Sequence, residues 1–114
     1  MGKFEIKIRK DGEFQFNLKA GNGEIILTSE GYTTKAACLN GIESVKKNSA
    51  DDSKFEVLEA KNGKIYFRLK AGNGQVIGAS QMYASNATAK KGIASVMRNA
   101  PEAVIVEIEP APEA

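Results

Sequence analysis

The hexapeptide Leu-Lys-Ala-Gly-Asn-Gly occurs twice in this chain of 114 residues, at 18–23 and at 69–74. Each copy lies in a longer repeat that aligns without a gap. Matched pairs are Phe4 with Phe55, Gly12 with Gly63, Phe16 with Phe67, Tyr32 with Tyr83 and Gly41 with Gly92. An internal repeat requires both copies to form the same structural unit. The sequence therefore predicts a single domain, 1–114, with repeat one at about 3–53 and repeat two at about 54–109.

Each repeat begins with two stretches in which apolar and polar residues alternate. In repeat one, Phe4, Ile6 and Ile8 alternate with charged residues, and residues 14–19 alternate in the same way. This alternation is typical of a strand with one buried face. A third, more uniformly apolar stretch follows at 24–28. We therefore expect three strands in each repeat.

Short polar segments separate these strands. They contain Asp11-Gly12 and Asn22-Gly23 in repeat one, and Asn62-Gly63 and Asn73-Gly74 in repeat two. Asp-Gly is the signal of a two-residue hairpin turn in which both turn residues take positive φ. We predict such a turn at Asp11-Gly12 and chain reversals at the other three positions.

A helix is expected after the third strand of each repeat. Its apolar face consists of Cys38, Leu39, Ile42 and Val45 in repeat one, and of Ala89, Ile93, Val96 and Met97 in repeat two. Thr33 or Thr34, and Ser85, are suitable N-caps. Gly41 and Gly92 lie in mid-helix, where glycine costs about 1 kcal/mol relative to alanine. Their recurrence predicts a close approach of the helix to a strand or to the other helix, unless it only reflects duplication.

Three strands and a helix are too few to bury a core alone. Two such units side by side predict an α+β fold, with one antiparallel sheet and both helices packed on its apolar face. The other face of the sheet would be open to solvent. The tail 110–114 offers no large apolar side chain and is expected to be frayed.

The repeated motifs also point to a family. Residues 18–23 and 69–74 are each followed by a strand, a tyrosine and a helix that contains Gly-Ile-x-Ser-Val, at 41–45 and 92–96. In this order the chain resembles the YegP-like family of small bacterial proteins, from residue 3 to about 109. The biochemical role of that family is unassigned, so the resemblance predicts a fold and no activity.

The resemblance implies a β3-α-β unit, used as a tandem pair or as a dimer of single units. The units share one sheet and exchange their last strands. It implies that strand 54–59 closes repeat one and opens repeat two. Residues 103–109 would return to the side of the first unit.

Composition excludes several classes of chemistry. The chain has no histidine, so the usual general base near neutral pH and Ser-His-Asp or Cys-His arrangements are excluded. The net charge of +2 is too balanced to indicate a polyanion partner. Cys38 has no partner for an internal disulfide and is expected in the core. We expect a cytoplasmic protein with no cofactor, no metal site and no membrane association.

The open face of the predicted sheet is the candidate binding surface. Its residues are Lys7, Arg9, Gln15, Asn17, Lys19, Tyr66, Arg68 and Lys70. A basic sheet that carries an aromatic residue can bind single-stranded nucleic acid by stacking and phosphate contacts. Glu5 and Glu56 share the face, however, and a solvated face of mixed charge has the same composition.

Three functional hypotheses follow. The first is a non-catalytic binding module that uses the open face or the sheet edges, with an unknown partner that could be protein or nucleic acid. The second is weak single-stranded nucleic-acid binding through Lys7, Arg9, Lys19, Arg68 and Lys70. The third is an enzyme of unknown class that uses Tyr32 and Tyr83 with Ser29 and Ser80. Packing against the following helix explains the repeated tyrosines better, so we predict a non-enzyme. Because both units are covalently joined, we also predict a monomer.

Overall fold

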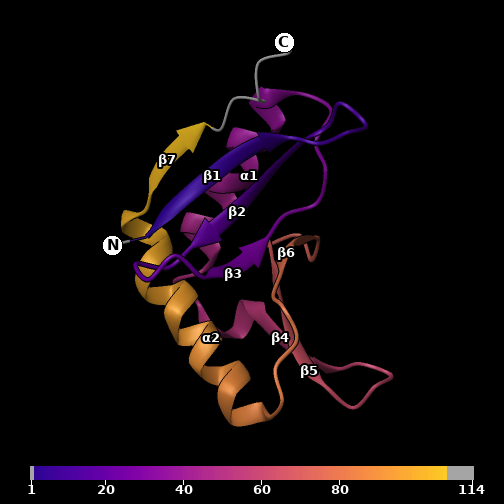
Figure 1. The fold of residues 1–114 in the computed structure, drawn as a ribbon. Helices are drawn as coiled ribbons and strands as arrows, with labels where there is room; N and C mark the ends of the chain where they lie inside the picture. The colour runs from indigo at the N-terminus through magenta and orange to yellow at the C-terminus, as the bar shows by residue number, and fades with distance from the viewer. Residues whose placement is uncertain (1, 108–114) are drawn as a thin grey trace.

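The computed structural model describes residues 2–107 and consists of a sheet with two helices (Figure 1). The strands of repeat one are β1 (Lys3–Ile8), β2 (Phe14–Lys19) and β3 (Ile25–Thr28), followed by helix α1 (Lys35–Asn48). Repeat two contains β4 (Phe55–Glu59), β5 (Ile65–Lys70), β6 (Val76–Ala79), helix α2 (Asn86–Asn99) and β7 (Val104–Glu107). Two 3-10 turns, η1 (Asp52–Lys54) and η2 (Ala100–Glu102), follow the helices. The predicted frayed tail 110–114 and residues 108 and 109, which end the predicted last strand, lie outside the described residues.

The strands form one seven-stranded sheet in the order β4-β5-β6-β3-β2-β1-β7. The repeats meet where β3 pairs with β6 through Thr28 and Ala79, which are equivalent positions. A sheet shared by both repeats was predicted, but a wholly antiparallel one is wrong, because β7 pairs with β1 in parallel. Tight reversals make neighbouring strands antiparallel within each repeat. No such reversal sets the direction of β7, since the chain reaches it through α2 and η2.

The chain reversals also differ from the prediction at Asp11-Gly12. The Gly12 N–H donates to the Arg9 carbonyl at 2.9 Å and the Arg9 N–H donates to the Glu13 carbonyl at 2.7 Å. The loop therefore has three residues, and only Gly12 has a positive φ, of 85°. The predicted two-residue turn is wrong because the Asp11 carboxylate accepts a hydrogen bond from the Glu13 N–H at 3.0 Å. This local bond holds Asp11 in ordinary backbone geometry.

The core lies between the sheet and both helices. Its fully buried side chains include Phe4, Phe16, Leu18 and Ile42 from repeat one, and Phe67, Leu69 and Val96 from repeat two. Helix α1 contacts β2, β5 and β6, and helix α2 contacts β3, β4 and β5. Each helix therefore covers strands of both repeats, so the two repeats share one core.

The glycines in the helices lie against tyrosines. A Cβ atom at Gly41 would overlap the Tyr32 hydroxyl and lie 2.8 Å from the ring Cζ, and one at Gly92 would lie 2.7 Å from the Tyr83 Cζ. Both tyrosines also stack on sheet residues, with ring centroids 6.3 Å apart for Tyr32 and Phe16 and 6.1 Å apart for Tyr83 and Phe67. The close approach predicted from these glycines is therefore present, and each tyrosine fills the space between helix and sheet.

One residue pair differs between the repeats at the centre of the core. Leu27 is fully buried, and its equivalent in repeat two is Gly78. A Cβ atom at Gly78 would lie 2.8 Å from the Leu27 Cγ and 2.9 Å from its Cδ2. The Leu27 side chain therefore occupies this space, and the glycine at position 78 leaves room for it. Two leucines would overlap there.

Candidate binding surface on the open face of the sheet

Strand register places seven of the eight candidate residues on the open face. Lys7 is opposite Gln15 on β1 and β2, and the same face continues through Asn17 and Lys19. Asn17 is only 7% exposed, however, so its predicted exposure on the binding surface is wrong. Tyr66, Arg68 and Lys70 lie on the same face of β5. Arg9 lies outside the strands, in the reversal after β1, where its guanidinium is 3.1 Å from the Asp11 carboxylate.

The sheet order separates these residues into two groups. One group lies on β1 and β2, the other on β5, and the junction strands β3 and β6 lie between them. Neighbouring strands are about 4.8 Å apart, so β2 and β5 are separated by about 14 Å. The candidate residues therefore do not form one continuous basic patch.

Each group is held together by a glutamate. The Glu5 carboxylate lies 2.9 Å from the Lys19 ammonium and 3.4 Å from that of Lys3. The equivalent Glu56 accepts a hydrogen bond from the Arg68 Nε at 3.1 Å and lies 3.3 Å from the Lys70 ammonium. The bond from Lys19 lowers the pKa of Glu5, and the bonds from Arg68 lower the pKa of Glu56. Two glutamates on the face therefore offset part of the positive charge of the four cations that they contact.

Glu5→Gln is expected to lower the free energy of unfolding by about 1 kcal/mol near neutral pH, because it removes the charge that Lys19 and Lys3 face. The pKa of Glu5 is lowered in the folded state. Its stabilisation is therefore complete above the pKa of an unfolded glutamate, about 4.3, and is lost as the pH falls through the folded value. Urea unfolding between neutral and acid pH measures the difference between the two proteins.

The control variant is Glu102→Gln, which changes an exposed carboxylate on η2. It should follow the wild type at every pH. A Glu5→Gln deficit that stayed constant into the acid range would contradict the ion-pair assignment.

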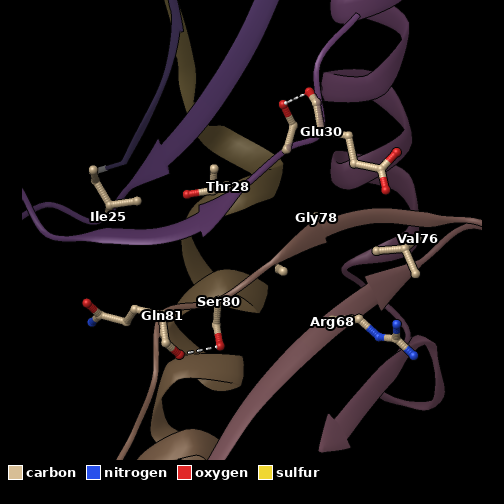
Figure 2. A pocket seen from close by; sticks show the side chains of 10 residues that line it. Ile25, Thr28, Glu30, Arg68, Val76, Gly78, Ser80 and Gln81 are labelled. Atoms are coloured by element: carbon tan, nitrogen blue, oxygen red, sulfur yellow. Dashed lines mark hydrogen bonds between the residues drawn. The ribbon is translucent and has the colours of Figure 1, made fainter. Parts of the chain in front are cut away.

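A depression lies between the two groups, at the junction of β3 and β6 (Figure 2). It has a volume of about 560 Å³. Its lining includes Ile25, Thr28 and Ser29 from repeat one and the equivalent Val76, Ala79 and Ser80 from repeat two. The depression is thus built by both repeats.

The sequence reasoning missed Ile25 and Val76, because the third strand of each repeat is almost uniformly apolar. A β-bulge lies beside this strand in each repeat. It leaves Ile25 opposite Lys19 and Val76 opposite Lys70, on the open face, while the next residue, Ile26 in repeat one, is buried. The available signal was the run of successive apolar residues shortly after each Asn-Gly reversal, 25–27 in repeat one and 76–77 in repeat two.

The serines that line the depression have structural partners. The Ser29 hydroxyl accepts a hydrogen bond from the Phe16 N–H at 2.9 Å and donates to the Glu30 carbonyl at 2.8 Å. The Ser80 hydroxyl is held in the same way, and Figure 2 shows its bond to the Gln81 carbonyl. Both hydroxyls therefore satisfy backbone groups, and within residues 2–107 neither is hydrogen-bonded to a side chain that could act as its general base.

The structure also bears on the lone cysteine, on metal ligands and on membrane-spanning helices. Cys38 is buried, and burial raises the pKa of its thiol. Among residues 2–107, no three histidine, cysteine, aspartate or glutamate side chains are grouped as metal ligands would be. Within the same range, no helix has the length and apolar character needed to cross a membrane.

These observations define a class of protein: a tandem α+β repeat with one shared core, whose open sheet face carries paired charges around a shallow depression. The family described as "Domain of unknown function (DUF1508)" matches the chain twice, at residues 10–56 and 60–107. A UPF0339 protein of Pseudomonas aeruginosa is 61% identical over 101 residues, which cover 89% of this chain and 92% of the relative. UPF0339 protein YegP of Yersinia pestis is 51% identical, with 95% and 96% covered. The chain belongs to the DUF1508 family.

Two solved structures of relatives have the same fold. The NMR structure of YegP from E. coli matches with a TM-score of 0.91 at 47% identity and covers 97% of this chain and 96% of that one. A UPF0339 protein of Shewanella oneidensis matches with a TM-score of 0.89 at 49% identity, over 95% and 92%. The resemblance to YegP-like proteins is confirmed. The E. coli protein is described as being of unknown function, and none of these descriptions names a catalytic activity.

Proposed function

We propose that the protein is a non-catalytic binding module and that it recognises a partner protein through the open face of its sheet. The observation that carries the proposal is the depression at the β3–β6 junction, which neither helix covers. Apolar side chains there face solvent, and Ile25 is 41% exposed. Exposed apolar side chains beside a few polar groups are typical of protein interaction sites.

The charges on this face favour a protein partner over nucleic acid. Lys19 faces Glu5, Arg68 and Lys70 share Glu56, and Arg9 faces Asp11, while Lys7 forms no ion pair within residues 2–107. A cation that is already paired gains little from a phosphate, because binding to nucleic acid is driven by the neutralisation of phosphates and the release of their counterions. The alternative of weak nucleic-acid binding is therefore disfavoured, and the face is better suited to a partner that contributes apolar surface.

The proposal includes the state in which the module works. We infer one folding domain and a monomer, supported by the core that both repeats share. The parallel pairing of β7 with β1 supports an exchange in which residues 103–109 complete the first unit. Strand β4 pairs with β5 of its own repeat. The only support for the idea that β4 closes repeat one is therefore its position in the chain directly after α1 and η1. We infer a cytoplasmic location from the single cysteine of the sequence, which excludes an internal disulfide framework.

Photo-crosslinking in cells that naturally contain the protein tests the proposed surface. A photoreactive residue at Thr28, in the depression, is expected to give a covalent adduct with a specific protein. The same residue at Lys47, exposed on α1, is the control and should give none. The Thr28 adduct should be removed by protease and resist nuclease.

Three results would contradict the proposal. They are equal adducts at Thr28 and Lys47, no adduct at Thr28, and an adduct that nuclease removes. The last result would favour nucleic-acid binding instead.

A further inference from the structure

The two ends of the sheet differ although the repeats are alike. Strands β1 and β4 are equivalent first strands, and each pairs on its inner side with the second strand of its repeat. On its outer side, β1 pairs with β7 in parallel. Of the strands within residues 2–107, none pairs with the outer edge of β4. Figure 1 shows β7 and β4 at opposite ends of the sheet.

The core side of β4 is exposed to a degree that β1 is not. Ile6 on β1 is 3% exposed, whereas its equivalent on β4, Val57, is 41% exposed. Phe4 is fully buried next to Ile105 of β7, whereas the equivalent Phe55 is only partly buried. A neighbouring strand would cover these side chains, as β7 does beside β1. The greater exposure on β4 therefore matches the absence of such a strand at this edge.

A groove of about 420 Å³ follows this edge, between β4 and α2. It is lined by Phe55, Val57, Ile93, Ala94 and Met97, with Lys90 and Asp52 also at its wall. The positions on α1 that are equivalent to Ala94 and Met97 carry Glu43 and Lys46. Helix α2 therefore presents apolar side chains beside the unpaired edge where α1 presents charged ones.

We propose that the outer edge of β4 and this groove bind an extended segment of a partner protein, which adds an eighth strand parallel to β4. The backbone of an edge strand offers unpaired N–H and C=O groups that such a segment satisfies. This site is separate from the open face and does not depend on the function proposed for that face.

The strand β7 indicates the chemistry of the segment. Its sequence, Val104-Ile-Val-Glu107, places three β-branched residues before an acidic one, and Ile105 lies next to Phe4. In the equivalent register the middle apolar residue would lie next to Phe55. Glu107 forms an ion pair with Lys35 of α1. In the groove the cation for an acidic residue is Lys90.

A second copy of this chain is a poorer fit than a partner segment. Two copies related by a two-fold axis would pair β4 with β4 in antiparallel orientation. The equivalent edge, on β1, takes its neighbour in parallel. The groove lies between β4 and α2, and β7 lies beside β1 with Glu107 paired to Lys35 of α1.

A peptide with the sequence of residues 101–107, blocked at both ends, tests the proposal by NMR titration into the full-length protein. It is expected to shift the amide signals of Phe55, Val57, Ala94 and Met97. Val57→Lys should weaken binding at least about tenfold, because it puts a charge in the apolar groove. Met82→Lys, at an exposed apolar residue outside the groove, is the matched control and should leave binding unchanged. The same peptide with aspartate in place of its isoleucine should not bind.

Other results would overturn the proposal. They are no shift at saturating peptide, shifts confined to β1 and α1, which would indicate exchange with β7, and equal binding to wild type and Val57→Lys. Sedimentation of the protein without peptide tests whether a second copy of the chain binds the β4 edge. A wild-type dimer that is dissociated by Val57→Lys would show that the edge is occupied by another copy and would overturn the proposal.

Discussion

Leu27→Gly is expected to lower the free energy of unfolding by about 4 kcal/mol, and adding Gly78→Leu to the same protein is expected to recover most of that loss. Leu27 is fully buried, so its removal exposes a cavity in the core. Gly78→Leu alone should cost about 3 kcal/mol, because its side chain would overlap that of Leu27. The two positions are equivalent in the repeat, and one leucine at either of them can fill the same space.

Urea unfolding of the wild type, both single variants and the double variant measures the coupling between the two sites. Gly72→Leu is the control for the added leucine, since Gly72 is exposed and has an ordinary φ. It should neither destabilise the wild type nor rescue Leu27→Gly. Additive losses in the Leu27 and Gly78 double variant would show that the two positions do not share one space.

Gly92→Ala is expected to destabilise the protein by about 2 kcal/mol, although alanine favours a helix over glycine by about 1 kcal/mol. The added methyl group would lie 2.7 Å from the Tyr83 Cζ. The ring has little room to move, because it stacks on Phe67 and the Tyr83 backbone is hydrogen-bonded to the Ile65 backbone. In a Tyr83→Ala background only the contact with the Phe67 Cε2, at 3.0 Å, remains, and that ring can move into the space the tyrosine leaves. The same Gly92→Ala change should then stabilise the protein by up to about 1 kcal/mol.

The reversal of sign between the two backgrounds is the decisive measurement, by urea or thermal unfolding. Lys91→Ala, at the neighbouring exposed helix position, is the control and should have the same small effect in both. If Gly92→Ala destabilised both backgrounds equally, the tyrosine would not be the reason for the glycine. Gly41 and Tyr32 allow the experiment to be repeated independently in repeat one.

The repeat made most of the fold predictable. Alternation in each copy indicated which side chains are buried, and Phe16 and Phe67 lie in the core as expected. The direction of β7 could not be predicted, because alternation is the same in parallel and antiparallel strands. The predicted length of the reversal at Asp11-Gly12 was wrong, because the hydrogen bond that the Glu13 N–H donates to the Asp11 carboxylate favours a three-residue loop.

The open face was predictable in part. Alternation placed Lys19, Arg68 and Lys70 correctly beside the two glutamates that share the face. The depression was not predictable, because it depends on bulges that change which way Ile25 and Val76 point. The exposure of Val57 was not predictable either, since it depends on which strand pairs with which edge across the whole chain.

The junction of β3 and β6, a single residue pair within the sheet, has a consequence for how the molecule opens. Because α1 and α2 each lie across both repeats, the halves cannot rotate about that pair without both helices leaving the sheet. Amide hydrogens on either side of the junction should therefore exchange with solvent only through global unfolding. We therefore expect the duplicated sequence to unfold as a single cooperative unit.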